Sequence, residues 1–386
     1  MAVINRIAAF HQDMIEWRHD IHAHPETAFE EHRTADVVAE KLVSFGLPIH
    51  RGLARTGVVA TLKVGDSPRR IGLRADLDAL HMEELNSFDW RSQHKGKMHA
   101  CGHDGHTSML LGAAKYLAET RNFDGTVDFI FQPAEESEGG GRVMVEEGLF
   151  KLFPADRVFG MHNMPGIKTG TFGIRSGALM ASSDSFEVIV TGTGAHAAMP
   201  HKGVDPMVCA AAIVQGWQTI ASRMTSPLES SVVSVTQIHA GEAWNVIPNS
   251  VLLRGSSRSF KPEIRDMLEE SLGRLAHGIA AGYGCTVEYR YMRRYPPTIN
   301  SATETEMAIQ AAIDVVGEAA VDTDVTPTMG AEDFSFMLQA KPGAYIFIGN
   351  GESTPGVHNP HYDFNDEILP IGASYFARLV EQQLAR

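Results

Sequence analysis

The sequence predicts an α/β protein with a discontinuous larger domain, whose mainly parallel sheet is flanked by helices, and a smaller inserted α+β domain. Its 386 residues exceed the roughly 100 to 200 that one domain usually contains. Segments typical of strands alternate with segments typical of helices, which is the pattern of layered domains with parallel sheets. The alternation changes after about Ser182 and returns after Pro296 and Pro297.

The first stretch of the chain contains helical and strand-like patterns. Apolar residues at helical spacing predict an amphipathic helix that Pro25 ends, and a second helix over 30–45 that Gly46 ends. A longer apolar segment predicts a helix over 107–119, and shorter apolar runs before and after it predict strands. These strands are expected at 57–63, 70–75, 126–131 and 158–161.

A different pattern occupies the middle of the chain, where strands and helices gather into an α+β insert. The strands are expected at 186–191, 232–238 and 286–291, and the helices at 205–224 and 261–282. The α/β alternation then returns with a helix over 304–316, a strand over 344–349 and a terminal helix over 372–384. The predicted domains are therefore residues 1–182 together with 294–386, and the insert 183–293.

The charge balance and the cysteines exclude several classes of protein. With 33 Lys and Arg against 47 Asp and Glu, the formal charge of −14 makes nucleic acids and anionic membranes unfavourable partners. The first residues lack the pattern of a signal peptide, and no apolar stretch approaches the ~20 residues of a membrane helix. Cys101, Cys209 and Cys285 are odd in number and widely separated, which argues against a disulfide framework. We therefore expect a soluble, cytoplasmic protein.

The densest group of reactive side chains lies at residues 98–106, Met-His-Ala-Cys-Gly-His-Asp-Gly-His, directly before an apolar helix. Cys101 and His103 are two residues apart, so in an extended segment they would point to the same side and bind one metal cluster. The glycines allow the backbone to turn tightly. His99 and His106 are not needed for this purpose, and we interpret them as residues that form local hydrogen bonds.

Adjacent glutamates, Glu135 and Glu136, follow the apolar strand expected at 126–131, and open α/β sheets place their sites at the carboxyl ends of strands. If this backbone is extended, the two side chains diverge, so one binds a metal while the other acts as general base toward bound water. A lone Glu-Glu pair is more often a solvated loop. The interpretation as a site gains weight from His162, at a similar strand end, and from His358.

Five nitrogen, sulfur or oxygen donors exceed the ligands of one zinc site, and a thiolate among imidazoles favours zinc or a neighbouring transition ion over magnesium. Two divalent ions sharing a bridging ligand are the economical explanation, with zinc, manganese, cobalt and nickel as candidates. Such a pair lowers the pKa of a bridging water and polarises a carbonyl oxygen, which is the chemistry of amide or ester hydrolysis. Asp76 and Asp78, at a third strand end, either orient a ligand or the base or form a structural salt bridge with Arg74.

Seven motifs occur in order and with suitable spacing: RADLDA (74–79), HACGHDGH (99–106), QPAEE (132–136), GAHAAMPH (194–201), NVIP (245–248), GAEDFS (330–335) and HNPHYDF (358–364). With them, nearly the whole chain resembles the M20 family of metallopeptidases and amidohydrolases, in its hippurate hydrolase, aminoacylase and auxin-conjugate hydrolase branch. The resemblance implies that Glu135 is the acid and base that activates water and later protonates the leaving amine. It also implies the metal ligands Cys101, His103, Glu136, His162 and His358.

The same resemblance implies that the discontinuous domain is catalytic and that the insert is a lid that commonly mediates homodimerisation. His196 of the lid would stabilise the oxyanion, in its own site or in that of a partner subunit. Asn245 and Arg258 would bind the carboxylate of the substrate, a group that the fork of an arginine grips bidentately. The chain departs from many relatives at His81, where they have proline, and at Ala240 before Gly241, where they have a glycine pair. The acyl specificity is therefore open.

The function expected from these residues is hydrolysis of N-acyl amino acids, of the hippurate or N-acetyl type, to a carboxylic acid and an amino acid. A dipeptidase or aminopeptidase of the same family would need a feature that recognises a free amine, and no additional acidic cluster in the insert suggests one. A metal-binding protein without activity should have lost Glu135. A cysteine hydrolase would use Cys101 as nucleophile, but a thiol crowded by metal-type donors is better explained as a ligand.

Overall fold

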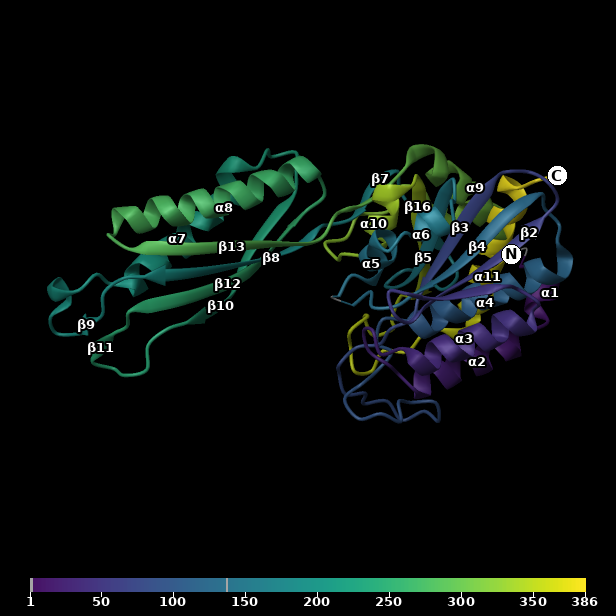
Figure 1. The fold of residues 1–386 in the computed structure, drawn as a ribbon, viewed down its shortest axis with the longest axis horizontal. Helices are drawn as coiled ribbons and strands as arrows, with labels where there is room; N and C mark the ends of the chain where they lie inside the picture. The colour runs from purple at the N-terminus through teal and green to yellow at the C-terminus, as the bar shows by residue number, and fades with distance from the viewer. Residues whose placement is uncertain (1–2, 137) are drawn as a thin grey trace. The chain divides into compact units, whose positions relative to one another are not determined.

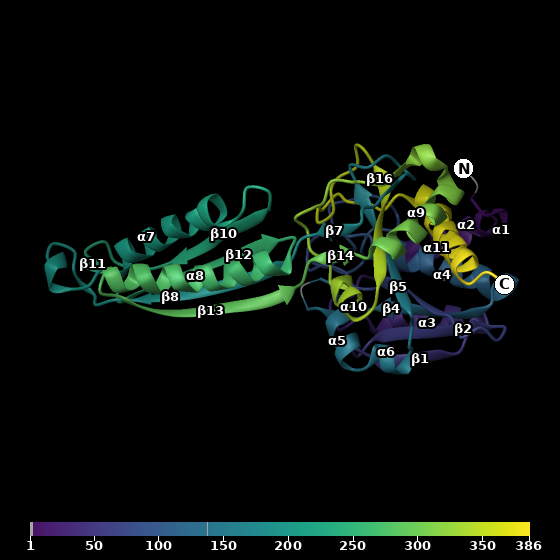
Figure 2. The same cartoon turned by 90° about the horizontal axis from the view of Figure 1, so that it is seen from above.

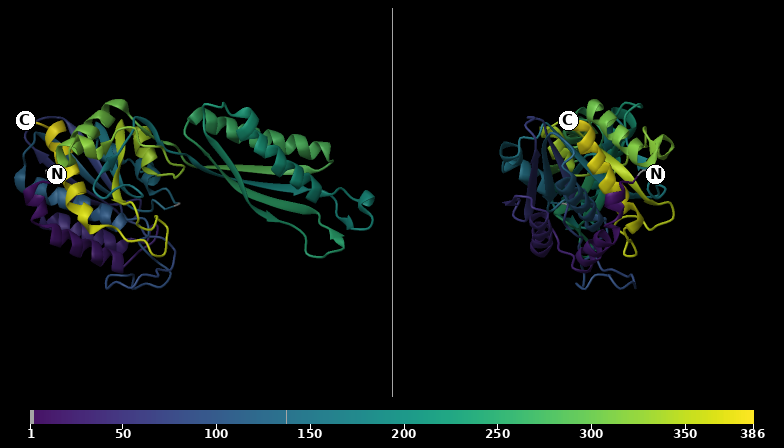
Figure 3. Two further views of the ribbon diagram at one scale, coloured as in Figure 1. Left: turned by 180° about the vertical axis from the view of Figure 1, so that it is seen from behind. Right: turned by 90° about the vertical axis from the view of Figure 1, so that its right-hand side faces the viewer.

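The computed structural model describes residues 3–136 and 138–386, which form two compact units. Unit 1 contains the residues up to Leu179 together with Ile299–Thr326 and Asp333–Arg386, and unit 2 contains Met180–Thr298 and Pro327–Glu332. Both ends of the chain belong to unit 1, as Figure 3 shows. The larger unit is therefore assembled from segments that are distant in sequence.

A mixed sheet forms the centre of unit 1. Its strands are β1 (Ile49–Leu53), β2 (Gly57–Val64), β3 (Arg70–Asp76), β4 (Gly125–Gln132), β5 (Arg157–Pro165), β6 (Phe172–Gly173), β15 (Val321–Asp322) and β16 (Gly343–Gly351). They are arranged in the order β1-β2-β4-β3-β5-β16-β6-β15. The central strands β4, β3, β5 and β16 are parallel, whereas β2 pairs with β4 and β1 pairs with β2 in the antiparallel sense. The predicted mainly parallel sheet is confirmed.

Helices flank this sheet on both faces (Figure 2). They are α1 (Asn5–Ala8), α2 (His11–Ala23), α3 (His32–Ser44), α4 (His103–Thr120), α5 (Gly140–Glu146), α6 (Leu149–Leu152), α9 (Ala302–Val316), α10 (Phe334–Ala340) and α11 (Leu369–Gln383). Successive side chains of a strand point to opposite faces, and β5 shows which helices lie on each. Its Phe159 and Met161 belong to the same core as α4 and α11, whereas Gly160 faces the ring of Phe334 in α10.

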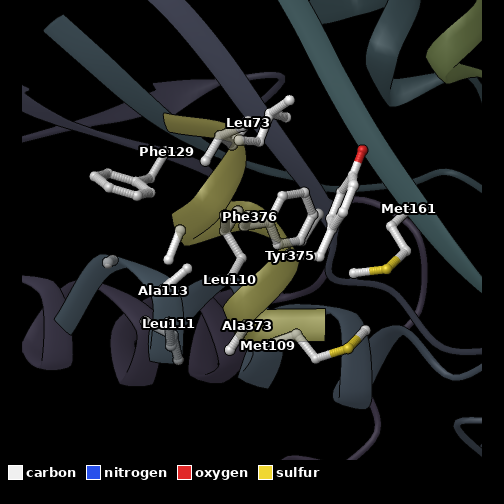
Figure 4. Packing of buried hydrophobic residues seen from close by; sticks show 14 of the residues in the cluster. Leu73, Met109, Leu110, Leu111, Ala113, Phe129, Met161, Ala373, Tyr375 and Phe376 are labelled. Atoms are coloured by element: carbon white, nitrogen blue, oxygen red, sulfur yellow. The ribbon is translucent and has the colours of Figure 1, made fainter. Parts of the chain in front are cut away.

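The main core of unit 1 lies between the sheet and helices α4 and α11, as Figure 4 shows. The labelled side chains come from β3, β4, β5, α4 and α11: Leu73, Phe129, Met161, Met109, Leu110, Leu111, Ala113, Ala373, Tyr375 and Phe376. Burial of apolar surface stabilises a fold by about 25 cal/mol per Å². This packing therefore fixes α4 against the strands, and with it the residues at the start of that helix.

Unit 2 is a sheet covered on one face by two helices (Figure 1). Its elements are β8 (Ser183–Thr191), β9 (Ala195–His196), α7 (Pro206–Thr219), β10 (Ser231–His239), β11 (Val246–Ile247), β12 (Ser250–Ser259), α8 (Pro262–Gly282) and β13 (Thr286–Tyr295). The main sheet is antiparallel with the order β10-β12-β8-β13, and β9 pairs with β11. On β8, Phe186, Val188 and Val190 alternate into an apolar core that also contains Trp217. Two short strands, β7 (Gly177–Met180) and β14 (Thr298–Asn300), occur at the unit boundaries in the sequence.

The structure differs from the predicted elements in a few places. The helix expected over 107–119 begins at His103, so the dense group of reactive residues lies partly in its first turn. The helix expected over 205–224 is α-helical only to Thr219 and continues as a π-helical turn, Ile220–Met224. Strand β12 lies outside the predicted elements, because its inward positions include Gly255 and serines instead of a full apolar series. Among the described residues, no helix combines the length and the apolar character needed to cross a membrane.

Candidate active site

The candidate site forms where strands β3, β4 and β5 end and helix α4 begins. The parallel register places Asp76, the last residue of β3, opposite Gln132, the last residue of β4. His162 lies near the carboxyl end of β5, which pairs in parallel with β3. The carboxyl ends of parallel strands meet at one edge of a sheet, and this geometry brings side chains from distant parts of the sequence together.

A tight turn at Gly102 joins Cys101 to helix α4. Gly102 has φ of +95°, and a Cβ there would lie 2.2 Å from Nδ2 of Asn163 and 2.5 Å from Oη of Tyr362. Only glycine suits this position, because it combines a left-handed backbone with close approach of side chains. The prediction that Cys101 and His103 lie on an extended segment is therefore wrong. Their ligand atoms nevertheless share one group, because the turn folds Cys101 back toward the first residue of the helix.

The structure gathers the predicted metal-binding side chains and Glu135 into overlapping groups, within each of which the ligand atoms lie within 4.8 Å of one another. Cys101 Sγ is 3.4 Å from Nε2 of His162, and Nε2 of His358 is 3.1 Å from Oε1 of Glu136. The groups are Cys101–His103–His162, Cys101–Glu136–His358 and His103–Glu135–Glu136. Donors from four separate segments thus form a continuous cluster in unit 1.

Hydrogen bonds orient two of these imidazoles. Nδ1 of His162 donates to the carbonyl of Asn163 at 2.5 Å, which leaves Nε2 directed at Cys101. Nδ1 of His103 donates to the carbonyl of Asp78 at 2.8 Å, and its Nε2 is buried without a hydrogen-bond partner among the described residues. A buried, unsatisfied imidazole nitrogen is costly unless a ligand uses it. This nitrogen, beside a thiol and carboxylates, fits a metal ligand whose second nitrogen is fixed by the backbone.

The two other histidines of the dense segment behave differently from each other. Nδ1 of His106 donates to Asp76 at 2.7 Å, and its Nε2 accepts the N–H of Asn163 at 3.0 Å, so both ring nitrogens are used locally. His99 is buried, and neither ring nitrogen has a hydrogen-bond partner among the described residues. Burial lowers the pKa of His99 to about 4. The local hydrogen bond expected for His99 does not occur among the described residues, and the low pKa makes its ring neutral near pH 7.

Glu135 and Glu136 lie in a turn, so the prediction of an extended backbone is wrong here also. The preceding Ala134 has φ of +56°, and the carboxylate of Asp78 accepts the N–H groups of Glu135 and Glu136, each at 2.9 Å. Asp78 is buried and also lies 3.3 Å from Nδ1 of His103. Asp78 therefore links the glutamate turn to one of the imidazoles.

Asp76 forms the salt bridge with Arg74 that was one of the two alternatives, and it also binds His106, which is not among the predicted ligands. It accepts the hydrogen bond from His106, and its other oxygen lies 2.6 Å from Nη1 of Arg74. Arg74 also donates to Gln132 and to Asp333, both at 2.9 Å. Burial alone would raise the pKa of Asp76, but His103, Arg74 and His106 hold it well below its ordinary value.

The carboxylates around Cys101 and His103 favour binding of a cation, as the pKa values of these two residues indicate. Burial raises the pKa of the Cys101 thiol well above its ordinary value, and the nearby carboxylates of Glu136, Glu135 and Asp76 raise it further. Burial lowers the pKa of His103, but Asp76 above all, with Asp78 and Glu136, outweighs burial and raises that pKa to about 10. A divalent cation would offset the carboxylate charge and favour the thiolate, because metal ligation requires deprotonated donors.

The remaining predicted residues belong to unit 2. His196 lies on β9 opposite Val246 of β11 and is exposed, and its Nδ1 accepts the N–H of Ala198 at 3.1 Å. Asn245 is exposed beside Trp244, whose side chain is fully exposed. Arg258 is half-buried on β12, and burial lowers its pKa against the opposing effect of Asp184. These side chains share a unit with one another and not with the cluster around Cys101.

Asn163 is a central residue of the site that the sequence interpretation missed. Its Nδ2 donates to the carbonyl of Cys101 at 2.7 Å, and its Oδ1 accepts the hydroxyl of Tyr362 at 2.6 Å. Its backbone contacts both His106 and His162. Its position directly after His162 at the end of a strand could have identified it. The sequence interpretation missed it because an amide side chain is not among the usual zinc ligands.

A buried group of imidazoles, a thiol and carboxylates at the ends of parallel strands, with one imidazole nitrogen left for a ligand, defines a metal-dependent α/β enzyme. The sequence profile of Peptidase family M20/M25/M40 matches residues 72–382, which is most of the chain. The chain belongs to this family. The resemblance that the motifs indicated is confirmed.

Relatives match the chain over nearly its full length. It is 40% identical to a hippurate hydrolase of Campylobacter jejuni subsp. jejuni over 384 residues, which cover 100% of both chains. It is 38% identical to an N-acetylcysteine deacetylase of Bacillus subtilis, over 96% of this chain and 97% of the relative. Among solved structures, a dinuclear metal-binding peptidase of the M20 family from Bacillus subtilis has 35% identity and a TM-score of 0.86, covering 98% and 99% of the two chains. Both units therefore have counterparts in these proteins.

Proposed function

We propose that this protein hydrolyses the amide bond of N-acyl amino acids and releases a carboxylic acid and a free amino acid. The observation that carries the proposal is the cluster in which Glu135 shares a group with His103 and Glu136, while Cys101, His162 and His358 complete the donor set. Relatives that are 38 to 40% identical over nearly the whole chain are a hippurate hydrolase and an N-acetylcysteine deacetylase. Both names describe removal of an acyl group from an amino acid.

The donors around Cys101 suit two divalent metal ions, with zinc, manganese, cobalt and nickel as candidates. Cys101, His103, Glu136, His162 and His358 would hold them. Such ions, when bound, polarise the amide carbonyl and lower the pKa of a water molecule. The buried Nε2 of His103, which has no hydrogen-bond partner among the described residues, supports this assignment, and so does the similarity to a dinuclear metal-binding peptidase.

Glu135 is the proposed general base and acid. Its carboxylate belongs to the same group as Glu136 and His103, and its backbone N–H is held by Asp78. From this position Glu135 takes a proton from the attacking water and returns it to the nitrogen of the leaving amino acid. Asp78 and Asp76 orient the residues around it, Asp78 through the glutamate turn and Asp76 through His106.

Residues 183–293, which lie within unit 2, have the proposed role of a lid and dimerisation domain, inserted into a catalytic domain of residues 1–182 and 294–386. His196 would stabilise the negative charge that develops on the carbonyl oxygen, and Asn245 and Arg258 would bind the carboxylate of the substrate. The exposure of His196 and Asn245, and the half-buried guanidinium of Arg258, are compatible with these roles. A homodimer or a higher homo-oligomer, formed through the lid domain in the cytoplasm, is the proposed state of the protein.

The direct test is hydrolysis of N-acetyl-methionine, hippurate and Gly-Leu by chelated protein, with and without added Zn²⁺, Mn²⁺ or Co²⁺. We expect chelation to abolish cleavage, and a metal to restore cleavage of the acylated substrates in preference to Gly-Leu. Preference for the free dipeptide would move the protein to the peptidase class. Absence of cleavage with every metal would contradict the proposal.

A further inference from the structure

Glu31 is a buried carboxylate that has no part in the metal cluster or in the proton transfers described above. It precedes helix α3, and its Oε1 accepts the N–H of Ala134 at 2.9 Å and that of Phe29 at 3.0 Å. Its Oε2 accepts the hydroxyl of Thr56 at 2.6 Å. Glu31 is 0% exposed, so these contacts replace water completely. One end of this network is therefore the residue directly before the proposed general base.

Together, Glu31 and Asp78 bind three consecutive backbone N–H groups. Glu31 accepts that of Ala134, and Asp78 accepts those of Glu135 and Glu136. Each N–H donates to a carboxylate oxygen, which makes a stronger hydrogen bond than a neutral acceptor does when the carboxylate is ionised. Because the two carboxylates come from different segments, the turn at 134–136 is held from two sides.

The turn needs this support because its backbone is unfavourable. Ala134 has φ of +56°, a left-handed conformation in which the Cβ of a non-glycine residue meets the following carbonyl. The carbonyl of Ala134 also accepts the N–H of Gly140 at 2.9 Å, so the turn closes on itself. Strained backbone persists where the surroundings determine it, and it is often found at functional sites.

The network is also costly in charge. Burial raises the pKa of Glu31 to about 7, and the nearby Asp78 carboxylate adds to this effect. Two carboxylates placed close together in a buried region would destabilise the fold if they served only as packing groups. The electrostatic cost of burying Glu31 and Asp78 is explained if these carboxylates hold the turn at 134–136 in a single geometry.

We propose that Glu31 is a positioning residue, which fixes the turn at 134–136 and so directs the side chains of Glu135 and Glu136 toward the donor cluster. The inference rests on the proposed function, in which Glu135 is the base and Glu136 a metal ligand. Glu31 touches neither substrate nor metal in this scheme. It acts through the N–H of Ala134.

Glu26 provides a matched control in the same segment. Its carboxylate also accepts three hydrogen bonds, from the N–H groups of Arg33 and Thr34 and from the hydroxyl of Thr34. These partners belong to the first turn of α3, so Glu26 supports its own helix. A general loss of stability in this region should follow removal of either glutamate, whereas an effect on the glutamate turn should follow removal of Glu31 alone.

The first measurement is steady-state hydrolysis of an N-acyl amino acid by metal-loaded Glu31→Ala, Glu31→Gln and Glu26→Ala. We expect Glu31→Ala to lower kcat about 10- to 100-fold with little change in KM, because a small displacement of a catalytic group costs this much. Glu31→Gln should retain most of the activity, because its amide oxygen still accepts from Ala134 and its amide nitrogen donates to Thr56. An equal loss of kcat in Glu31→Gln, or in Glu26→Ala, would overturn the proposal.

The second measurement is hydrogen exchange in the metal-free protein, and it does not depend on activity. Glu31→Ala should accelerate exchange of the amides of Ala134, Glu135 and Glu136, while Glu26→Ala leaves them protected. If Glu31→Ala does not fold, Glu31→Asp shortens the side chain by one methylene and should accelerate the same amides. Unchanged exchange at these amides would overturn the proposal. If the wild-type protein cleaves no acylated substrate, the proposed function fails, and this exchange result alone decides the role of Glu31.

Discussion

The two units bury polar groups in opposite ways. In unit 1, charged side chains such as Arg74, Asp76 and Asp78 are at most 1% exposed and gather around the donor cluster. In unit 2, the core around Trp217 is formed by apolar side chains, Asp184 and Arg265 form a buried ion pair, and His196 and Asn245 are exposed. Burial of charge is costly unless each group is paired. The buried charges of unit 1 therefore lower its stability but hold the site in one geometry. In unit 2, by contrast, His196 and Asn245 lie at the surface, outside the apolar core.

The two units also differ in the contacts that hold the candidate site residues in place. His103 and His162 are oriented by hydrogen bonds from one ring nitrogen to backbone carbonyls. His196 is placed mainly by the short β9–β11 pairing, and its ring accepts one local N–H. A preorganised site needs no ordering during the reaction, which is an advantage for electrostatic catalysis.

The largest effect is expected from Glu135→Gln, which removes the proposed base from unit 1. We expect a loss in kcat of about 10³- to 10⁴-fold, near the upper end for general acid–base catalysis, with metal content and melting temperature unchanged. Metal analysis and steady-state kinetics check this prediction. Substantial remaining activity in this variant would show that Glu135 is not the base.

Asp184→Asn tests the scaffold of unit 2. The carboxylate of Asp184 binds Arg265 through two contacts of 2.6 and 2.8 Å, and it also accepts the hydroxyl of Tyr291 at 2.9 Å. Loss of one partner of a buried ion pair should destabilise unit 2 by about 3 kcal/mol. Hydrogen exchange should therefore accelerate for amides of β8 and β12 and not for those of α4. Equal acceleration in both units would show that they unfold together, and it would contradict the view that the Asp184–Arg265 pair stabilises unit 2 alone.

His196→Ala tests whether an exposed residue of unit 2 takes part in catalysis. We expect kcat to fall about 100-fold, as for removal of one oxyanion donor, while metal content stays constant. Activity that reappears on mixing this variant with Glu135→Gln would show that His196 acts in the site of a partner subunit. Parallel loss of metal and activity would instead give His196 a structural role.

The smallest effect concerns the pH dependence of unit 1. His22 is buried between Asp104, at 2.9 Å, and Glu84, at 3.2 Å. Burial lowers its pKa, but Asp104 and Glu84 outweigh burial and raise that pKa from 6.5 to about 9. A raised pKa means that this contribution to stability is complete below pH 6.5 and is lost as the pH rises through about 9.

His22→Gln should remove this dependence. We expect the difference in the free energy of unfolding between wild type and variant to shrink by about 2 kcal/mol from pH 7.5 to pH 9.5. Denaturant titrations at the two pH values provide the measurement. A constant difference across this range would show that His22 carries no extra proton in the folded protein.

The sequence predicted the layered fold and the donor residues more successfully than the local geometry of the site. Strand-end patterns placed Glu136 and His162 together because parallel strands align their carboxyl ends. The sequence indicated only that glycines permit a tight turn near Gly102, and it did not indicate the turn at Ala134, because φ values of +95° and +56° follow from contacts with residues far away in sequence. Glycine allows such a turn, but only the position of Asn163 and Tyr362 requires it.

Supporting residues were hard to find for a related reason. Glu31 and Asn163 act on backbone groups of segments that are 103 and 62 residues away in sequence. Their side chains carry no spacing pattern that separates them from ordinary surface residues. Strand β12 escaped prediction because Gly255 leaves room for the ring of Phe186, whose Cζ would lie 2.2 Å from a Cβ at that position. Tertiary packing, and not strand propensity, selects that residue.

The fully exposed Trp244 has an optical consequence. Its indole is in water, whereas that of Trp217 in the same unit is buried and donates to the carbonyl of Leu272. An indole in water emits at longer wavelength and is quenched more readily by a dissolved quencher than a buried one. The red edge of the emission spectrum therefore reports, without any attached label, whether something covers the loop that carries Asn245.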